Sequence, residues 1–349
     1  MENFTNKISR LELENFTCFA KADMDFSSGI NVFIGENGTG KTHILKVLYA
    51  MNYAASKIEI KPNDDEKGTN SVLFNPYNFI SEMAFTFGTT TWIDLIKDID
   101  ISNTSFKTTF FKGLEFGLGF LKGELAGLKL TLSDIDIESP IYIPPYEMLS
   151  NAVLSNDKIY YDLVKALNIK KREADLDILK AINELVSIQV EKKEDTFYIG
   201  VNKRKSVKAN LSANGLNKIG QLIPLIQNGS LNKDTILFWD EPETNLNPKY
   251  IKIVAKFLQI LAKNGVQIFV ATHDYYLSHL LSLNAEYREQ TDAPPIKFFS
   301  LSKGENGTEI ESADTIAWLK NNAIVEEYAH FYDLESQLFA DTMKKPEFA

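Results

Sequence analysis

The chain has 349 residues, of which 44% are hydrophobic and 24% charged, so it can form one large globular domain or two modest ones. Its net charge of −10 is opposite to that of most proteins that coat nucleic acid, although a local basic patch stays compatible with it. A single cysteine, a charged N-terminus and no apolar run of about 18 residues argue against a disulfide framework, a secretory signal and a membrane-spanning helix, so we expect a cytoplasmic protein.

Alternating apolar and polar residues predict three strands at the start of the chain, over residues 7–14, 20–26 and 29–34. Glycines punctuate residues 35–40, and from Thr42 the apolar residues recur at helical spacing. A strand, a glycine-rich turn and a helix in succession are the setting that a phosphate-binding loop requires.

The middle of the chain has a different pattern. Residues 57–75 are polar and predict a loop. Short apolar runs that predict an antiparallel sheet follow at residues 83–87, 90–95, 106–111, 128–132 and 141–146. Residues 156–188 have helical periodicity, and residues 196–210 predict a hairpin with a basic turn.

The last part of the chain alternates between helices and strands. The predicted elements are helix 214–228, strand 235–240, helix 248–263, strand 266–272, helix 274–283, strand 295–301 and a mostly helical tail. Such alternation at both ends predicts an α/β fold, with a core of residues 1–56 and 210–349. Residues 57–209 are expected to form an inserted α+β lobe of antiparallel strands, helices and the basic hairpin.

Residues 35–42, which we call the phosphate loop, read GENGTGKT and match the pattern G-x-x-x-x-G-K-T. Backbone N–H groups of such a loop, and of the helix that follows it, bind phosphates. Lys41 is placed to reach the β- and γ-phosphates, and the Thr42 hydroxyl to ligate Mg²⁺. A glycine-rich turn without a ligand is the alternative interpretation.

A second motif, TILFWDEPE at residues 235–243, is an apolar strand that ends in two acids. Successive side chains at a strand end diverge, so Asp240 can support Mg²⁺ while Glu241 polarises the attacking water. A further apolar strand ends at His273, which can bind a γ-phosphate or a water near it. Taken alone, the two acids also fit a solvated strand end, and His273 also fits a histidine satisfied by its own backbone surroundings.

Four motifs in order, GENGTGKT, SANGLNKIGQL, LFWDEPETNLNP and IFVATHD, resemble the ABC-type ATPases. The resemblance is strongest to the stand-alone RecF-like and SMC-like branch, including relatives of the OLD-family ATPase domain that lack a TOPRIM nuclease. It covers residues 7–55 and 210–302 and implies a P-loop NTPase head, a mixed sheet flanked by helices, that hydrolyses ATP with Mg²⁺.

The resemblance also implies roles for individual residues. The catalytic residues would be Glu241, His273 and Lys41, and the metal ligands Thr42 and Asp240. Residues expected to bind ATP are Gly35, Asn37, Gly38, Thr39, Gly40, Lys41, Thr42, His43, Ala213, Asn214, Gly215 and Asn245.

Two positions depart from the family pattern. The signature LSGGQ is LSANG at residues 211–215, which places Ala213 where a serine would contact the γ-phosphate, unless Ser212 serves after a shift of one residue. No glutamine precedes Gln189, and Glu147 is the nearest polar candidate for the Q-loop. Both departures predict slow hydrolysis.

A single phosphate loop with a single signature implies a head-to-tail homodimer with two shared ATP sites. The lobe of residues 57–209 would carry the resulting motion to a separate effector, such as a nuclease, in nucleic-acid maintenance or phage defence. Two basic runs are compatible with nucleic-acid binding or with solvated surfaces; they are Lys170–Lys171–Arg172 and Lys203–Arg204–Lys205 with Lys208 nearby.

Two other functions are compatible with the sequence. The first is a nucleotide-locked scaffold that binds ATP with little turnover, which the altered signature favours. The second is the ATPase subunit of a membrane transporter, which predicts an intact LSGGQ and a Q-loop glutamine that this chain lacks.

Overall fold

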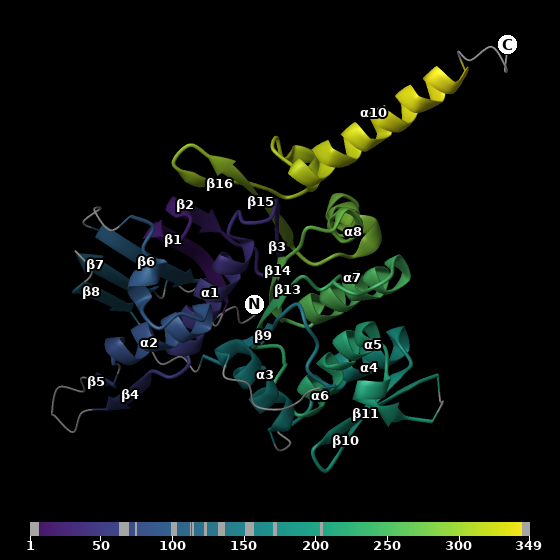
Figure 1. Ribbon diagram of the computed structural model, residues 1–349. Coiled ribbons are helices and arrows are strands. Elements are labelled where there is room, and N and C mark those ends of the chain that lie inside the picture. Colours follow the sequence, from purple (N-terminus) through teal and green to yellow (C-terminus); the bar gives the residue numbers. More distant parts are fainter. Residues whose placement is uncertain are drawn as a thin grey trace.

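A computed structural model describes residues 7–62, 70–73, 75–98, 103–111, 113, 115–121, 124–131, 137–150, 157–169, 173–202 and 205–343. Two large sheets and the helices between and around them make up most of it (Figure 1). This is the expected α/β fold, a mixed sheet flanked by helices, so the predicted fold class is confirmed.

The six-stranded sheet carries the phosphate loop. Its order is β16 (Gly307–Ala313), β15 (Ile296–Gly304), β3 (Ile30–Gly35), β14 (Gln267–Ala271), β13 (Ile236–Asp240) and β9 (Ile141–Ile143). Neighbouring strands are parallel except β15 and β16. Every residue of β3, β13 and β14 is buried, as expected of parallel strands covered on both faces.

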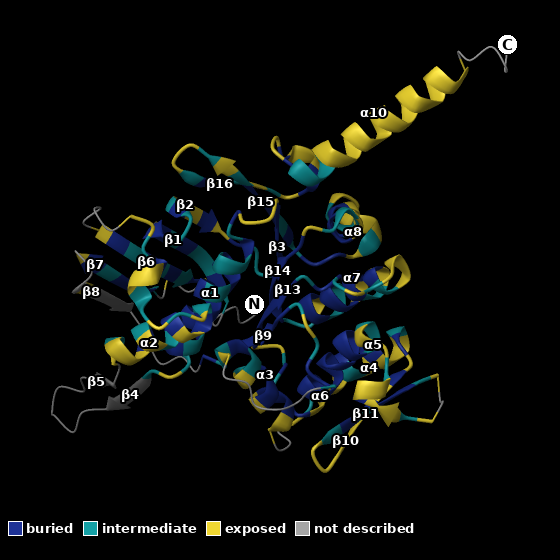
Figure 2. Cartoon of the chain, in the orientation of Figure 1, coloured by how far each residue is buried: buried dark blue, intermediate teal, exposed yellow. Residues whose placement is uncertain are grey.

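Alternate residues of these strands point to two separate cores. Val32 and Val270 face α7 (Pro248–Lys263) and α8 (Tyr275–Glu286), while Phe33 and Phe269 face α1 (Lys41–Ala55). Figure 2 shows the resulting buried band through the middle of the molecule. The central sheet is therefore fixed from both sides, which holds the loop after β3 rigidly.

The second large sheet is antiparallel and has five strands. Its order is β2 (Phe19–Asp25), β1 (Ile8–Phe16), β6 (Asn103–Phe110), β7 (Glu115–Leu121) and β8 (Glu124–Thr131). Its apolar face packs on α1 and α2 (Pro76–Phe87). Strands from residues 57–209 thus extend the sheet begun by β1 and β2, and β9 closes one edge of the six-stranded sheet. The division into a core and an inserted lobe stays a prediction.

The remaining elements surround these sheets. They are β4 (Glu59–Pro62), β5 (Asn70–Leu73), η1 (Trp92–Leu95), α3 (Lys158–Asn168), α4 (Leu176–Leu185), β10 (Ile188–Lys193), β11 (Thr196–Val201), β12 (Val207–Lys208), η2 (Ala209–Leu211), α5 (Asn214–Gly220), α6 (Leu222–Gln227), α9 (Arg288–Thr291), η3 (Ile316–Trp318) and α10 (Ala323–Met343). Strands β10, β11 and β12 form a small sheet, and β4 pairs with β5. No helix in the described ranges is both long enough and apolar enough to cross a membrane.

Two of the predicted strands are wrong. Residues 83–87 lie in α2, and residues 92–95 form η1. Asn75 caps α2 by accepting a hydrogen bond from the Tyr77 N–H, and a proline occupies its first turn. Phe79 and Met83 are buried one turn apart. These capping and spacing signals outweigh the β propensity of the aromatic run.

Several other boundaries differ from expectation. The predicted loop 57–75 contains β4 and β5, and the tail contains β16, which pairs with β15 through a turn at Gly304–Gly307. The predicted helix 214–228 is two helices, α5 and α6, and β10 begins at the end of the predicted helical segment 156–188. Lys170, Lys171, Arg172, Lys203 and Arg204 lie outside the described residues.

Candidate active site

The phosphate loop leaves the carboxyl end of β3 and leads directly into α1 (Figure 1). Gly35 and Gly40 have φ angles of 144° and 94°, which residues with a Cβ disfavour. A Cβ on Gly35 would overlap the carbonyl oxygen of Leu301, and one on Gly40 would lie 2.7 Å from Cζ of Phe19 and closer still to Sγ of Cys18. The backbone path therefore requires glycine at both positions.

The ammonium group of Lys41 lies inside the loop. Its Nζ donates hydrogen bonds to the carbonyl oxygens of Gly35, at 2.7 Å, and Glu36, at 2.8 Å. Burial lowers the pKa of Lys41, while the nearby carboxylates of Glu241 and Asp240 oppose that shift. Lys41 is also the first residue of α1, so a cation and a helix N-terminus converge where a phosphate would bind.

A hydrogen bond joins the phosphate loop to the acidic end of β13. The hydroxyl of Thr42 donates to Oδ2 of Asp240 at 2.9 Å. The phenol of Tyr142, on β9, donates to the same oxygen at 3.2 Å. Burial raises the pKa of Asp240, and the bond from Thr42 opposes that effect. The sequence analysis missed Tyr142, because β9 is distant in sequence and matches no motif.

This arrangement suits Mg²⁺. The hydroxyl of Thr42 and the carboxylate of Asp240 are hard oxygen donors, which Mg²⁺ prefers, and they lie beside the loop that would hold phosphates. No group of three or more His, Cys, Asp or Glu side chains in the described residues is arranged to hold a metal by itself. Such a sparse donor set fits a metal that is bound together with substrate phosphates rather than in a closed protein cage.

Glu241 follows Asp240 in a strained conformation. Its φ is +46°, which is uncommon for a residue with a side chain, and its N–H donates to the Ala271 carbonyl at 2.9 Å. Its Oε2 accepts a hydrogen bond from the Thr244 hydroxyl at 3.1 Å, and its Oε1 lies 3.5 Å from Nδ1 of His273. The side chain is 31% exposed, so water can reach it.

Two buried ionisable residues that were not predicted as site residues support the turn after β13. Oε1 of Glu243 accepts hydrogen bonds from the Thr272 hydroxyl, at 2.7 Å, and from the N–H of His273, at 3.3 Å. Lys218, on α5, donates to the Glu241 carbonyl, and burial lowers its pKa to about 8. A Glu two residues after the acidic pair and a Lys three residues after the signature were visible in the sequence, but their burial was not.

The signature segment packs on the turn after β13. Ala213 precedes α5 as its N-cap without a side-chain hydrogen bond, and Ala213 and Asn214 are exposed. A Cβ on Gly215 would lie 3.1 Å from the carbonyl oxygen of Asn245. Asn245 is itself exposed, with φ of +65°. The signature and the turn that contains Asn245 are therefore held together, and both have exposed residues.

The other predicted residues have mixed placements. Asn37 and Gly38 are exposed at the tip of the phosphate loop, whereas Thr39 is buried and donates to the Glu36 carbonyl at 2.9 Å. The His43 side chain packs on Phe87 instead of facing the loop, with ring centroids 5.4 Å apart. Glu147 hydrogen-bonds Ser150, its local neighbour. If His43 contacts a nucleotide, it would therefore do so through its backbone and not through its side chain.

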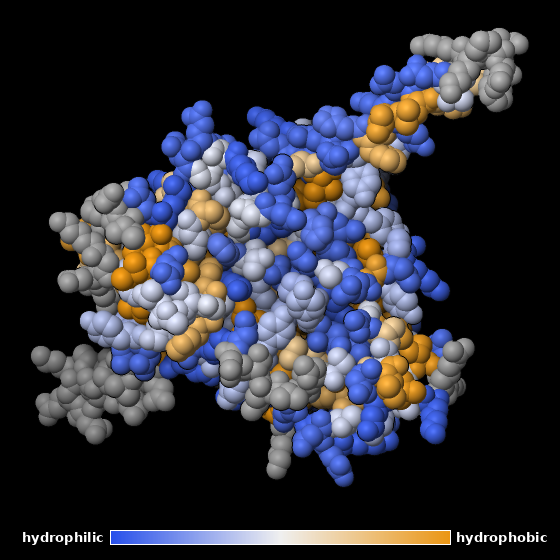
Figure 3. Space-filling view, viewed as in Figure 1, coloured by the Kyte–Doolittle hydropathy of each residue, from blue (hydrophilic) through white to orange (hydrophobic). Residues whose placement is uncertain are grey.

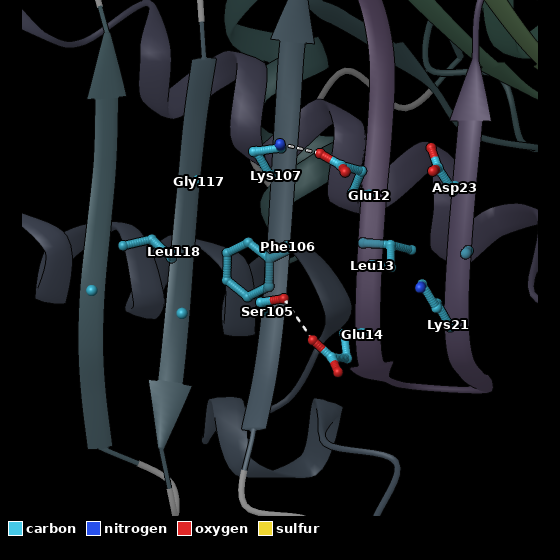
Figure 4. Close-up of a pocket in the computed structure, with 13 residues that line it drawn as sticks. Glu12, Leu13, Glu14, Lys21, Asp23, Ser105, Phe106, Lys107, Gly117 and Leu118 are labelled. Atoms are coloured by element: carbon cyan, nitrogen blue, oxygen red, sulfur yellow. Dashed lines mark hydrogen bonds and ion pairs between the residues drawn. The ribbon is translucent and has the colours of Figure 1, made fainter.

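A separate hollow of about 490 Å³ lies on the outer face of the five-stranded sheet (Figure 4). Bare backbone at Gly117, Gly119 and Gly127 forms its floor on one side. Lys107 pairs with Glu12 across neighbouring strands on the other side. None of the predicted ATP-binding or catalytic residues lines it, and it opens on the face opposite α1, so it is not part of the phosphate site.

Comparisons with known proteins agree with this geometry. A model of the family described as "AAA domain, putative AbiEii toxin, Type IV TA system" matches residues 30–278. The DNA replication and repair protein RecF of Hydrogenovibrio crunogenus is 26% identical over 138 residues, which are 40% of this chain and 32% of that protein. RecF of Streptococcus suis is 46% identical over 44 residues, 13% of this chain and 12% of that protein.

Further likenesses are to a DNA repair ATPase and to an SMC head domain. The DNA double-strand break repair Rad50 ATPase of Thermococcus kodakarensis is 41% identical over 64 residues, 18% of this chain and 7% of that protein. The chain thus spans well under half the length of these curated relatives. Among solved structures, the SMC head domain from Thermotoga maritima has a TM-score of 0.50 at 13% identity, covering 88% of this chain and 99% of that one. The fold is therefore that of an SMC-head-like P-loop ATPase.

Proposed function

The chain belongs to the AAA-domain family described as "putative AbiEii toxin, Type IV TA system", and we propose that it binds Mg-ATP at its phosphate loop and hydrolyses it with Glu241. The observation that carries this proposal is the 2.9 Å hydrogen bond from Thr42 to Asp240. It places the loop that would bind phosphates beside the acidic strand end, with Glu241 and His273 adjacent.

The residues divide the chemistry between them. Backbone N–H groups of the phosphate loop and the ammonium of Lys41 bind the β- and γ-phosphates and neutralise the charge that develops on them. Thr42 and Asp240 hold Mg²⁺, which supplies further charge neutralisation when bound. Glu241 orients a water whose oxygen attacks the γ-phosphorus as the bond to the bridging oxygen of ADP breaks. The water's proton passes to the Glu241 carboxylate and then to the released phosphate.

His273 lies beside Glu241, where its side chain could respond to the presence of the γ-phosphate. Its Nδ1 is 3.5 Å from Glu241, and its backbone N–H is fixed by the buried Glu243 carboxylate. A γ-phosphate near Nε2 would orient the ring and hence the glutamate. The strained backbone at Glu241 is held by the Ala271 carbonyl and by Lys218, which would keep its carboxylate beside His273.

We further propose that two copies share each ATP head to tail. Support comes from the signature, since Ala213 and Asn214 are exposed and no side-chain hydrogen bond caps α5 at Ala213. Leu211, at the start of this segment, is 75% exposed. An N-terminal end of α5 supplied by a second chain would complete the site.

The biological role that we propose is control of a separate effector, such as a nuclease, in nucleic-acid maintenance or phage defence. The family description names a toxin of a toxin–antitoxin system, and the RecF and Rad50 relatives are named for DNA replication and repair. Within the family we favour the RecF-like branch related to the OLD-family ATPase domain. ATP would bring the copies together and hydrolysis would release them, which would switch the effector.

A nucleotide-locked scaffold is a second candidate, because Ala213 has no hydroxyl to offer a γ-phosphate. Light scattering with and without Mg-ATP, together with phosphate release, separates the two functions. For the ATPase we expect slow turnover in the wild type, and an ATP-stabilised dimer without turnover for Glu241→Gln. Glu289→Gln, an exposed glutamate on α9, is the matched control and should behave as wild type.

The other results are equally informative. ATP-dependent dimerisation of the wild type without any phosphate release would identify the scaffold. Turnover by an unchanged monomer that Glu241→Gln does not alter would contradict both the shared site and the role of Glu241.

A further inference from the structure

Helix α10 extends from the molecule with an uncovered apolar face (Figures 1 and 3). From residue 326 to residue 343 every position is exposed. The large apolar side chains on it are Tyr328, Phe331, Tyr332, Leu334, Leu338, Phe339 and Met343, each between 44% and 67% exposed. At about 100° per residue they occupy one half of the helix circumference. A face of this size on one helix is typical of a docking surface.

Among the described residues, α10 contacts the rest of the chain at its base. The Asn322 side chain caps the helix by accepting hydrogen bonds from the N–H groups of Ile324 and Val325. The Tyr328 ring stacks on Tyr275 of α8, with centroids 4.2 Å apart. Beyond that first turn and a half the helix points away from the body (Figure 1). Apart from Tyr328, the face is therefore not buried against the described part of the chain.

The charge on α10 indicates what can cover it. Residues 323–343 contain five acidic side chains and neither lysine nor arginine; the acids are Glu326, Glu327, Asp333, Glu335 and Asp341. Glu335 lies within the apolar half, next to Phe331 and Leu338, and Glu327 lies at its edge. Two α10 helices packed on each other would bring like charges together, which disfavours that pairing. The complementary surface should be apolar with a basic rim.

The solvent face of α7 has this character. The helix carries four lysines, Lys249, Lys252, Lys256 and Lys263, and no acidic residue. All four are exposed, and partly buried Ile253 and Ile260 lie between them, seven residues apart. Lys263 already pairs with Asp292 at 2.8 Å, whereas Lys252 and Lys256 make no ion pair with any residue of the described ranges. The lysines span about 21 Å, within the roughly 31 Å length of α10.

From this complementarity we propose that α10 of one copy docks on α7 of a second copy, and that two such contacts related by a twofold axis form a dimer without nucleotide. The acidic rim of α10 would pair with the α7 lysines while Phe331 and Leu338 cover Ile253 and Ile260. This interface goes beyond the proposed ATP-dependent contact, since it uses neither the phosphate loop nor the signature. It would keep two copies together while their ATP sites open and close.

Charge reversal tests the contact on the full chain, with sedimentation velocity in the absence of nucleotide. One variant is Lys252→Glu with Lys256→Glu, and the other is Glu327→Lys with Glu335→Lys. We expect a wild-type dimer and at least a tenfold rise in the dissociation constant for each variant alone. Mixing the two variants should restore the dimer, because both contacts in the mixed pair again join opposite charges. Lys193→Glu with Lys233→Glu is the control and should leave the dimer intact, since these exposed lysines lie on β10 and in the turn before β13.

Any of four results would overturn the proposal. A wild-type monomer without nucleotide would show that no such dimer forms. Dimers that persist in both variants would use another surface. Loss in the α10 variant alone would point to α10 pairing with itself or with a separate protein. Failure of the mixture to recover would show that the two charged faces do not meet. ATP-dependent association of the α7 variant, measured in parallel, reports separately on the proposed function.

Discussion

The hydroxyl of Thr42 donates a 2.9 Å hydrogen bond to Oδ2 of Asp240, although 198 residues separate them in the sequence. The bond exists because β3 and β13 lie on either side of β14 in one parallel sheet, so both carboxyl ends open on the same edge. It couples the first turn of α1 to the acidic strand end.

We expect Asp240→Asn to weaken the Mg²⁺ dependence of ATP binding while leaving the fold intact. Asparagine keeps an oxygen for the Thr42 hydroxyl but loses the charge that would hold the metal. ATP affinity measured across a Mg²⁺ titration should become nearly independent of the metal, and phosphate release should fall by about 100-fold or more. Asp234→Asn, an exposed neighbour, is the control. An unchanged Mg²⁺ requirement would remove Asp240 from the metal site.

Tyr142→Phe should affect the same site more mildly. The substitution removes one hydrogen bond to Asp240 and keeps the buried ring, so we expect the apparent affinity for Mg²⁺ to drop several-fold with ATP affinity nearly intact. A hydrogen bond to a charged group contributes about 1.5–3 kcal/mol, which sets the upper limit of the effect. Tyr198→Phe, on β11 of the small sheet, serves for comparison. Equal effects from the two variants would contradict a role for the Tyr142 hydroxyl.

Lys218 should make the free energy of unfolding depend on pH in the alkaline range. Burial holds its folded-state pKa at about 8, against 10.5 as the ordinary value, so between these pH values the unfolded chain binds more protons than the folded one. The free energy of unfolding should therefore rise with pH across this window, by about 3 kcal/mol relative to Lys218→Met, which lacks the titrating group. Urea denaturation of both proteins from pH 7.5 to 10.5 measures the difference. Parallel curves would mean that Lys218 titrates normally.

The same substitution tests how Lys218 positions the catalytic loop. Its ammonium donates to the carbonyl of Glu241 and, at 3.4 Å, to that of Thr244. Without it we expect kcat to fall by about tenfold or more while ATP affinity changes little, since the phosphate loop is untouched. Lys218→Arg should recover part of the rate. Equal losses in kcat and in ATP affinity would indicate a structural role alone.

Gly40→Ala should be more damaging than Gly38→Ala, although both glycines have positive φ. A Cβ at position 40 would collide with Phe19 and Cys18, whereas one at position 38 meets no atom within 4 Å. We expect losses of about 2–4 kcal/mol and about 1 kcal/mol in the free energy of unfolding, respectively. Cys18→Ala should recover part of the loss in Gly40→Ala. Thermal denaturation compares the wild type, Gly38→Ala, Gly40→Ala and Gly40→Ala combined with Cys18→Ala. Equal losses of stability in Gly38→Ala and Gly40→Ala would rule out the collision.

Sequence periodicity was sufficient to predict the helices and strands that hold the site. It predicted the strand and helix on either side of the phosphate loop, as well as β13, α7 and β14, with boundaries within about two residues. These elements have strong local signals: all-apolar strands, a proline in the first turn of α7 and glycines where the backbone needs them. It failed for residues 83–87, because aromatic residues serve equally in a buried strand and on the buried side of α2.

The sequence by itself determined the phosphate loop, since the groups that would bind phosphate are consecutive backbone N–H groups, a lysine and a hydroxyl within eight residues. Only the tertiary structure decided that Tyr142 and Lys218 reach the acidic strand end, and that β6, β7 and β8 extend the sheet begun by β1. Contacts of that kind depend on strand order and on burial. They join residues 23 positions apart for Lys218 and Glu241 and 98 positions apart for Tyr142 and Asp240, and they leave no local pattern in the chain.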